Sequence, residues 1–495
     1  MGIHQEWAKE WRRDQGDAFV VTHMKCKTIF IDAQVQLMKS FVRENETTWR
    51  EFIHRTFFSQ LTHYHHKFDT VIICFDNYAN VPIFKSIEQS KRVSGNKFTF
   101  KFDSSDTLPT GPCEQKIWVQ ALQNRSFKTK VISLIASMIA TEYTPPRRGT
   151  TLVVDFVNST RIDYKSKEQI RTVLPDMKAM GESDVKFMRY VGIFGDMCID
   201  SIDSDVLLIA AHFVTRNAYQ GNIYVRRYKT RLPVPTATDS NTAEGKKRKL
   251  SEAQVPKTKA KFEYEIIHIN VLVKVLHSCF PAECLQAPPL VRGKGLGMLG
   301  DVEMEMDCED TDISDTEAAG PVSAETTRTP PAYENKAHLN AILIFMVLLC
   351  GCDYSKKLPR IGVRSVWENM NTLVPAMMQC SSYENDIFSV DVDLTINTMI
   401  VGLYVRVYSK HIPEKKTTST MSSVLHQLKN SKLSDKTKQD LPTHATLNTM
   451  IRNIEWVINY WAIENGDPVC CVDGSNGYSL ENNKLVWGAA AAANT

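Results

Sequence analysis

The sequence predicts an α/β fold that begins with a parallel β-α-β unit, and three observations support this. Residues 28–32 and 70–76 are short apolar runs rich in β-branched and aromatic residues, as in strands buried on both faces of a parallel sheet. Residues 34–67 between them have the length and periodicity of a helical crossover. The composition, 43% hydrophobic and 23% charged, is that of an ordinary globular protein.

Further elements follow in order along the chain. Residues 151–157 and 206–213 are apolar runs that predict two more strands, and residues 184–191 predict a short helix. Residues 264–280 have the pattern of a strand followed by a helix. The apolar stretch 341–350 predicts a buried core helix, because it is shorter than the ~18 residues needed to cross a bilayer. No membrane association is expected.

The C-terminal part of the chain is predicted to be mostly helical, with helices over residues 362–379, 394–410 and 446–465. Residues 233–260 and 286–333 lack periodicity and are rich in Pro, Thr, Ser, Gly or charge, which predicts disordered insertions.

These patterns divide the chain into six parts, and the alternative is a domain boundary near residue 230. The parts are an N-terminal region 1–230, an insertion 231–262, a continuation of the core 263–285, an acidic insertion 286–333, a further core region 334–465 and a tail 466–495.

Seven acidic residues stand in contexts that favour a functional site. Two follow apolar strands, four form two pairs spaced i, i+2, and one follows the apolar helix; they are Asp32, Asp76, Glu182, Asp184, Asp203, Asp205 and Asp353. Carboxylates are costly to bury, but a bound cation makes them tolerable at strand ends. Oxygen ligands of this kind suit Mg²⁺, and pairs of such ions hydrolyse phosphate esters. The pattern therefore predicts a two-metal site for phosphodiester hydrolysis.

A purely structural role is the alternative for each acid. An Asp after a strand often caps a helix or forms a turn, and this alternative is strongest for Asp203 and Asp205. Asp155 also ends an apolar run and is the acid most easily overlooked as a site residue. Asp200 lies nearby and is expected at the surface.

Together these segments resemble the flap endonuclease/XPG superfamily of structure-specific 5′ nucleases. The chain opens Met-Gly-Ile-His, and residues 75–92 resemble the family's second acidic segment and the arch helix after it. Residues 349–364 resemble its last acidic segment and helix–hairpin–helix, and the spacing of the two acidic pairs also fits. The matches occur in the family's order within residues 1–92 and 180–375.

The resemblance implies a PIN-like flap-endonuclease fold, in which a central, mostly parallel sheet carries helices on both faces, a helical arch and a helix–hairpin–helix. It implies cleavage of flapped or branched DNA, in replication or repair, with two Mg²⁺ ions for which Mn²⁺ can substitute. The first four of the seven acids would hold chiefly one ion and the last three chiefly the other. Family members usually carry Glu at the position of Asp184.

The resemblance also assigns a catalytic role to two basic residues in an arch over residues 82–127. Lys85 and Arg92 are seven residues apart, so they share one face of the expected helix. In the family, the matching residues stabilise charge in the reaction. The alternative is an ordinary solvated basic face.

Five residues are expected, by resemblance, to bind nucleic acid. Gly2 would lie near the site once the initiator methionine is removed, and Phe41 would stack on a base in place of the family's aromatic residue. Arg360, Gly362 and Arg364 would contact duplex phosphates at the hairpin. The family's hairpin has Gly where Arg360 stands, and Arg disfavours the positive φ that Gly adopts freely. A K⁺ ion at this hairpin therefore has little support.

Charge is unevenly distributed along the chain. The net charge is only +3, but residues 301–317 carry nine acidic residues and no Lys or Arg, so the remainder is basic and suited to a polyanionic partner. The cluster Lys246, Lys247, Arg248 and Lys249 predicts nuclear import, with a nucleic-acid tether as the alternative.

The sequence leaves alternatives open for the partners and for the substrate. No Gln-x-x-hydrophobic-x-x-aromatic-aromatic peptide ends the chain, so docking to a sliding clamp through it is not expected, and we expect a monomer. The substrate could also be mRNA, because host-shutoff endonucleases of some herpesviruses share this fold. A third alternative is a weakly active protein that binds DNA junctions as a replication scaffold, which the seven retained acids disfavour.

Overall fold

The computed structural model describes most of the chain and leaves several segments out. The described residues are 6–40, 42, 48–77, 114–115, 118, 122, 125–156, 158–164, 169–174, 181–229, 263–286, 331–351, 358–412, 420–462, 478–481 and 484–487.

A mixed sheet forms the centre of the described part, with nine strands in the order β1-β9-β8-β7-β2-β3-β4-β5-β6. Its five middle strands run parallel to one another: β8 (Ile223–Lys229), β7 (Met197–Asp200), β2 (Thr28–Asp32), β3 (Thr70–Cys74) and β4 (Thr150–Asp155). Antiparallel strands extend both edges: β1 (Val20–Val21), β9 (Glu263–His268), β5 (Ser159–Tyr164) and β6 (Ile170–Leu174). The predicted α/β class is confirmed, with a sheet that is parallel only in its middle.

Each central strand contributes side chains to two separate cores, because successive residues of a strand point to opposite faces. Phe30 and Ile72 belong to the core on one face, whereas Ile29 and Ile73 belong to the core on the other. All four side chains are at most 1% exposed, which explains why these strands read as unbroken apolar runs.

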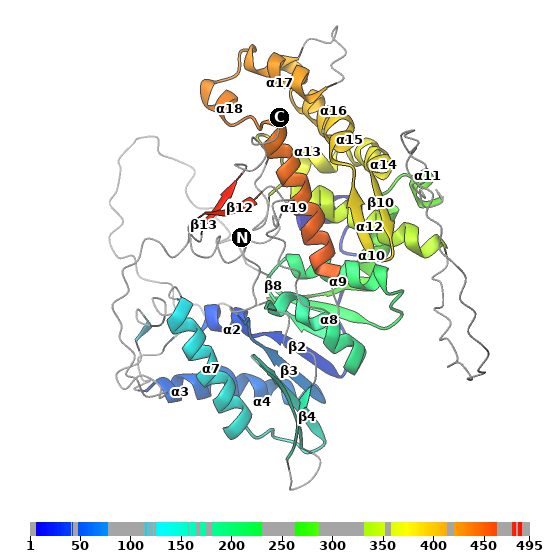
Figure 1. Ribbon diagram of the computed structural model, residues 1–495. Helices are drawn as coiled ribbons and strands as arrows, with labels where there is room; N and C mark the ends of the chain where they lie inside the picture. The colour runs from blue at the N-terminus through cyan, green and yellow to red at the C-terminus, as the bar shows by residue number, and fades with distance from the viewer. Residues whose placement is uncertain are drawn as a thin grey trace, which may run out of the picture.

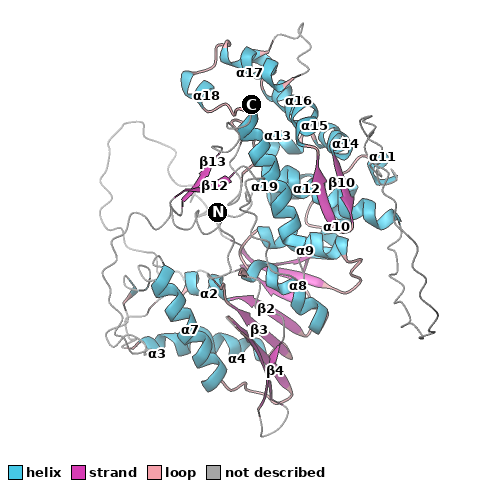
Figure 2. Ribbon diagram, viewed as in Figure 1, coloured by secondary structure: helices cyan, strands magenta, loops and turns pink. Residues whose placement is uncertain are grey.

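Helices cover both faces of the sheet (Figure 2). One face packs against α2 (Ala33–Lys39), α3 (Trp49–Ile53), the π-helical turn η1 (His54–Phe58), α4 (Ser59–His65) and α7 (Arg125–Glu142). The other packs against α8 (Ser183–Phe194), α9 (Asp205–Arg216) and α10 (Ile269–Ser278).

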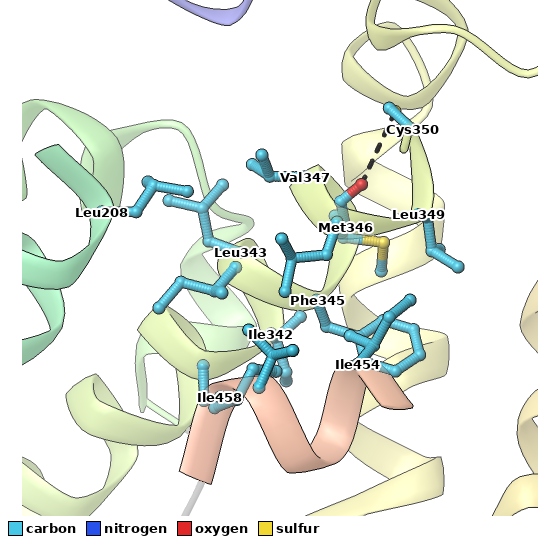
Figure 3. Packing of buried hydrophobic residues seen from close by; sticks show 14 of the residues in the cluster. Leu208, Ile342, Leu343, Phe345, Met346, Val347, Leu349, Cys350, Ile454 and Ile458 are labelled. Carbon is cyan, nitrogen blue, oxygen red and sulfur yellow. Dashed lines mark hydrogen bonds between the residues drawn. The ribbon is translucent and has the colours of Figure 1, made fainter. Parts of the chain in front are cut away.

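Helix α9 lies between the sheet and the C-terminal helices (Figure 1), and one hydrophobic core includes residues of all three. Helix α12 (Pro331–Leu349) is buried from Leu339 to Leu349 and packs against α9, α14 (Met370–Cys380) and α19 (His444–Ala462). Figure 3 shows Leu208 of α9 and Ile454 of α19 on either side of α12. Sheet and C-terminal helices therefore share one hydrophobic core.

The remaining elements are short and lie mainly around these helices. They are α1 (Glu6–Gln15), α11 (Ala282–Gln286), α13 (Val363–Trp367), the hairpin β10 (Ser381–Glu384) and β11 (Ile387–Val390), α15 (Val392–Thr395), η2 (Ile396–Ile400), α16 (Val401–Val407), η3 (Ser409–His411), α17 (Met421–Lys429), α18 (Asp435–Gln439), and the pair β12 (Tyr478–Glu481) and β13 (Lys484–Trp487).

Most predicted elements are confirmed, but one strand is not. The strand at 28–32 and the strand–helix pair at 264–280 occur as predicted, and the strand predicted at 70–76 is β3, which ends two residues earlier, at Cys74. Residues 206–213, predicted as a strand, belong to helix α9. Every residue of α9 from Asp205 to Thr215 is buried, and a segment that is apolar on all sides shows no helical periodicity.

Candidate metal centre

Four chain segments meet at the carboxyl edge of the parallel strands. Strand β2 ends at Asp32, and Asp76 follows β3 by two residues. Glu182 is the N-cap of α8, and Asp205 is the first residue of α9, which follows β7 through a short loop. Because β3 and β7 are the two neighbours of β2, the topology alone brings these acids to one place.

The hydroxyl of Ser183, the first residue of α8, links three of the acids. It lies 2.9 Å from Asp32 Oδ1, 3.1 Å from Asp76 Oδ1 and 3.4 Å from Asp184 Oδ1. The backbone N–H of Ser183 also donates to Asp76 Oδ1, at 2.9 Å. Asp32, Asp76 and Asp184 therefore converge on a single buried oxygen.

A second serine joins the other acidic pair to this group. Ser201 donates to Asp32 Oδ2 at 3.3 Å and accepts from the backbone N–H of Asp203 at 3.2 Å. The backbone N–H of Asp205 donates to Asp203 Oδ1 at 3.3 Å. The two acidic pairs are thus connected through Asp32.

Helix capping and site membership coincide at these acids. Asp32 caps α2 by accepting from the backbone N–H of Gln34 at 3.0 Å. Asp184 and Asp205 stand in the first turns of α8 and α9, where the helix dipole favours negative charge. The capping alternative is therefore true of Asp32, and it leaves the clustering of the acids unchanged.

Burial and repulsion raise the pKa of Asp32 to about 7, because its carboxylate is desolvated and faces the charge of Asp76. Hydrogen bonds from Ser183 and the Gln34 backbone act against this shift, and Asp203 adds to it. Asp32 is only 4% exposed. Without a cation, keeping these buried carboxylates ionised costs free energy. A bound cation would remove that cost.

The side chains of the cluster are near one another without forming a finished coordination sphere. Across the described residues, no group of three or more His, Cys, Asp or Glu side chains is arranged so that it could hold a metal ion as it stands. Glu182, Asp184 and Asp205 are each buried, at 2%, 8% and 5% exposure. The chemistry of the donors, carboxylate oxygens throughout, is that of a site for a hard divalent cation.

Several predicted site residues lie outside the described residues. They are Gly2, Phe41, Lys85, Arg92, Asp353 and the basic cluster Lys246, Lys247, Arg248 and Lys249, together with most of the expected arch, the insertion 231–262 and residues 287–330 of the acidic insertion. The ends of the acidic insertion, predicted to be disordered, are instead helical, because Gln286 ends α11 and residues 331–333 begin α12. Helix α12 ends at Leu349 and is followed by Gly351 with φ 99°, two residues before Asp353.

The predicted hairpin is described from Leu358 onward. The backbone N–H of Ile361 donates to Leu358 O at 3.1 Å, which closes a tight turn, and Gly362 is the N-cap of α13. Arg360 takes φ 59°, in the left-handed region that favours Gly, and its guanidinium lies 5.8 Å from the ring centre of Tyr408. Arg364 is exposed and bonds Glu368 at 2.7 Å.

Two acids near the cluster form hydrogen bonds and ion pairs with residues outside it. Asp155 accepts from Lys186 at 2.8 Å and from Tyr190 at 2.7 Å in a fully buried network. Asp200, expected at the surface, is 1% exposed and pairs with Arg226 at 2.6 Å, so that prediction was wrong. Its partner lies on the neighbouring strand, and sequence spacing carries no signal for such pairing.

Sequence reasoning missed the residues that hold the cluster together. Ser183 and Ser201 each lie between or beside acids already singled out, but a lone serine resembles any helix cap. Lys186 sits in the buried core, where burial alone would lower its pKa; the adjacent Asp155 outweighs this and raises it. The one available signal was a lysine on the otherwise apolar face of a predicted helix.

Comparison with known protein families and with curated proteins finds no match for this chain. Among the described helices, none is both long enough and apolar enough to cross a membrane.

The Asp32→Asn substitution should stabilise the metal-free protein at alkaline pH. The pKa of Asp32 is higher in the folded protein than in the unfolded chain, where the pKa of Asp is about 4. The contribution of Asp32 to stability is therefore complete below about pH 4 and is lost as the pH rises through about 7. Urea unfolding in chelator at pH 8 should show the variant more stable by roughly 2–4 kcal/mol, with the gap closing towards pH 5. Asp163→Asn, which removes a carboxylate outside the cluster, is the control. A stability difference between Asp32→Asn and wild type that does not change with pH would contradict this account.

The Arg360→Gly and Arg360→Ala variants should differ in stability. Both lose the guanidinium contact with Tyr408, but only Gly adopts the positive φ of this turn without strain. Urea unfolding should show the Gly variant more stable than the Ala variant by about 1 kcal/mol. Equal stabilities would mean that the turn relaxes out of this conformation.

Proposed function

We propose that this protein is a Mg²⁺-dependent nuclease of the flap-endonuclease type, which cuts branched or 5′-flapped DNA in replication or repair. The observation that supports this most is the convergence of Asp32, Asp76 and Asp184 on one buried hydroxyl at the carboxyl ends of the central parallel strands. Carboxylates brought this close repel one another unless a cation is present. A PIN-like sheet with an arch and a helix–hairpin–helix is part of the same proposal.

The donor set suits two Mg²⁺ ions, with Mn²⁺ as a substitute, because Mg²⁺ prefers oxygen ligands and keeps part of its water shell. One ion would be held chiefly by Asp32, Asp76, Glu182 and Asp184, and the other chiefly by Asp203, Asp205 and Asp353. When bound, the ions supply the Lewis acidity that neutralises phosphate charge and lowers the pKa of an attacking water.

The chain's own groups orient the ligands and the substrate. The Ser183 N–H fixes Asp76 and the Asp205 N–H fixes Asp203, so both carboxylates are held by helix N-termini. By resemblance, Lys85 and Arg92 would stabilise charge on the scissile phosphate.

Binding of duplex DNA would fall to the hairpin. Arg360 and Arg364 are exposed beside the tight turn, and the Gly362 segment begins α13 there. These groups would contact phosphates and not bases, so affinity should fall steeply with salt and depend little on sequence. The basic cluster Lys246–Lys249 would direct the protein to the nucleus.

The Asp203→Ala substitution should abolish cleavage while leaving DNA binding nearly unchanged, because Asp203 would hold an ion and not the nucleic acid. Single-turnover cleavage and fluorescence anisotropy on the same flap substrate separate the two effects. Asp163→Asn removes a carboxylate that pairs with Arg161 on β5, away from the cluster, and should cut normally. Wild-type cleavage by Asp203→Ala would show that this cluster is not the active site.

The preferred nucleic acid is tested with one 5′-flap substrate synthesised both as DNA and as RNA, with the flap end either free or blocked by a bulky adduct. We expect Mg²⁺-dependent cutting of the DNA near the single-strand/double-strand junction, suppressed by the block, because the flap must thread past the arch. Internal cutting of RNA that ignores both junction and block would instead indicate an mRNA endonuclease. Tight junction binding without cutting would indicate a scaffold.

A further inference from the structure

We propose that the Ser183 hydroxyl is a bridging hydrogen-bond donor that links Asp32, Asp76 and Asp184 in the metal-free protein and releases them when a divalent cation binds among them. This inference rests on the proposed metal site. Ser183 is 0% exposed, so its hydroxyl is shielded from bulk solvent. Its contacts, at 2.9, 3.1 and 3.4 Å, are with one carboxylate oxygen of each acid.

A cation shared by the three acids would compete with this hydroxyl for the same carboxylate oxygens. A serine hydroxyl has one proton, so it cannot donate fully to three carboxylates at once. The proton is shared among oxygens that surround it, and each carboxylate turns one oxygen towards the same point. A cation bound by these three oxygens would need the same orientation.

The backbone already positions two of the acids without help from the hydroxyl. Asp76 accepts from the Ser183 N–H at 2.9 Å, and Asp32 accepts from the Gln34 N–H at 3.0 Å. Removing the hydroxyl therefore leaves both carboxylates in place but takes away the group that bridges them. Their repulsion then rises in the metal-free protein and is cancelled when a cation binds.

The hydrogen bonds of Ser183 and the binding of the metal should oppose each other. A hydrogen bond present only without metal stabilises the metal-free state, so it weakens metal binding by the same factor. A hydrogen bond to a charged group corresponds to about a tenfold change in an equilibrium constant or somewhat more. Ser183 would thus lower the affinity for the cation while protecting the fold in its absence.

The test compares wild type with Ser183→Ala in chelator and in saturating Mn²⁺. We expect the melting temperature of the variant to be lower by a few degrees in chelator and close to that of wild type in Mn²⁺. Calorimetric titration should show Mn²⁺ binding about tenfold more tightly to the variant. Ser183→Cys, similar in size but a weak donor, should shift both quantities in the same direction and serves if the Ala variant fails to fold.

The matched control is Ser159→Ala. Ser159 is also buried, at 1% exposure, and its hydroxyl bonds Tyr190 at 2.6 Å within the Asp155 network, outside the acid cluster. Its removal should lower the melting temperature equally with and without Mn²⁺ and leave Mn²⁺ affinity unchanged.

Two results would overturn the inference while leaving the metal site intact. An equal loss of stability in chelator and in Mn²⁺ would make Ser183 an ordinary packing residue. Weaker Mn²⁺ binding by Ser183→Ala would make its hydroxyl a ligand or a pre-organising group. Failure of the metal site is distinguishable, because wild-type melting curves in chelator and in Mn²⁺ would then coincide.

Discussion

The burial of mutually repelling carboxylates at one edge of the sheet is the constraint on which this site depends. Parallel strands β2, β3 and β7 end at one edge, and their topology forces Asp32, Asp76 and the Asp203 loop together. The fold offsets that repulsion with serine hydroxyls and with the N–H groups at helix starts. These groups orient the acids without neutralising them, as the raised pKa of Asp32 shows.

The surrounding core encloses the elements that carry these acids. The strands are buried on both faces, and α9, whose first residue is Asp205, is enclosed between the sheet and α12. The buried pair of Lys186 and Asp155 adds a tie from α8 to β4, and Lys186 also donates to Phe75 O at 3.3 Å, next to Asp76. Carboxylates on such elements can separate by backbone movement only if the packed elements move as well.

Sequence patterns predicted the central strands β2, β3 and β4 and the acids at the ends of β2 and β3, because both follow from local rules, but they missed the central strands β7 and β8. An apolar β-branched run ending in Asp indicates a strand that opens onto an edge, as at Asp32. The same reasoning failed at residues 206–213, where complete burial hides the helical period. It also failed for Asp200 and Ser183, whose roles depend on partners far away in sequence, Arg226 and Asp32. Such pairings are properties of the assembled sheet.

The central claim is that the acid cluster binds divalent cations. Anomalous diffraction from crystals soaked in Mn²⁺ tests it most directly, since it locates the ion independently of any cleavage assay. We predict an anomalous peak within about 2.5 Å of carboxylate oxygens of Asp32, Asp76 or Asp184, the range of metal–oxygen bonds. Mn²⁺ bound only elsewhere, with this cluster unchanged from the metal-free crystal, would contradict the account.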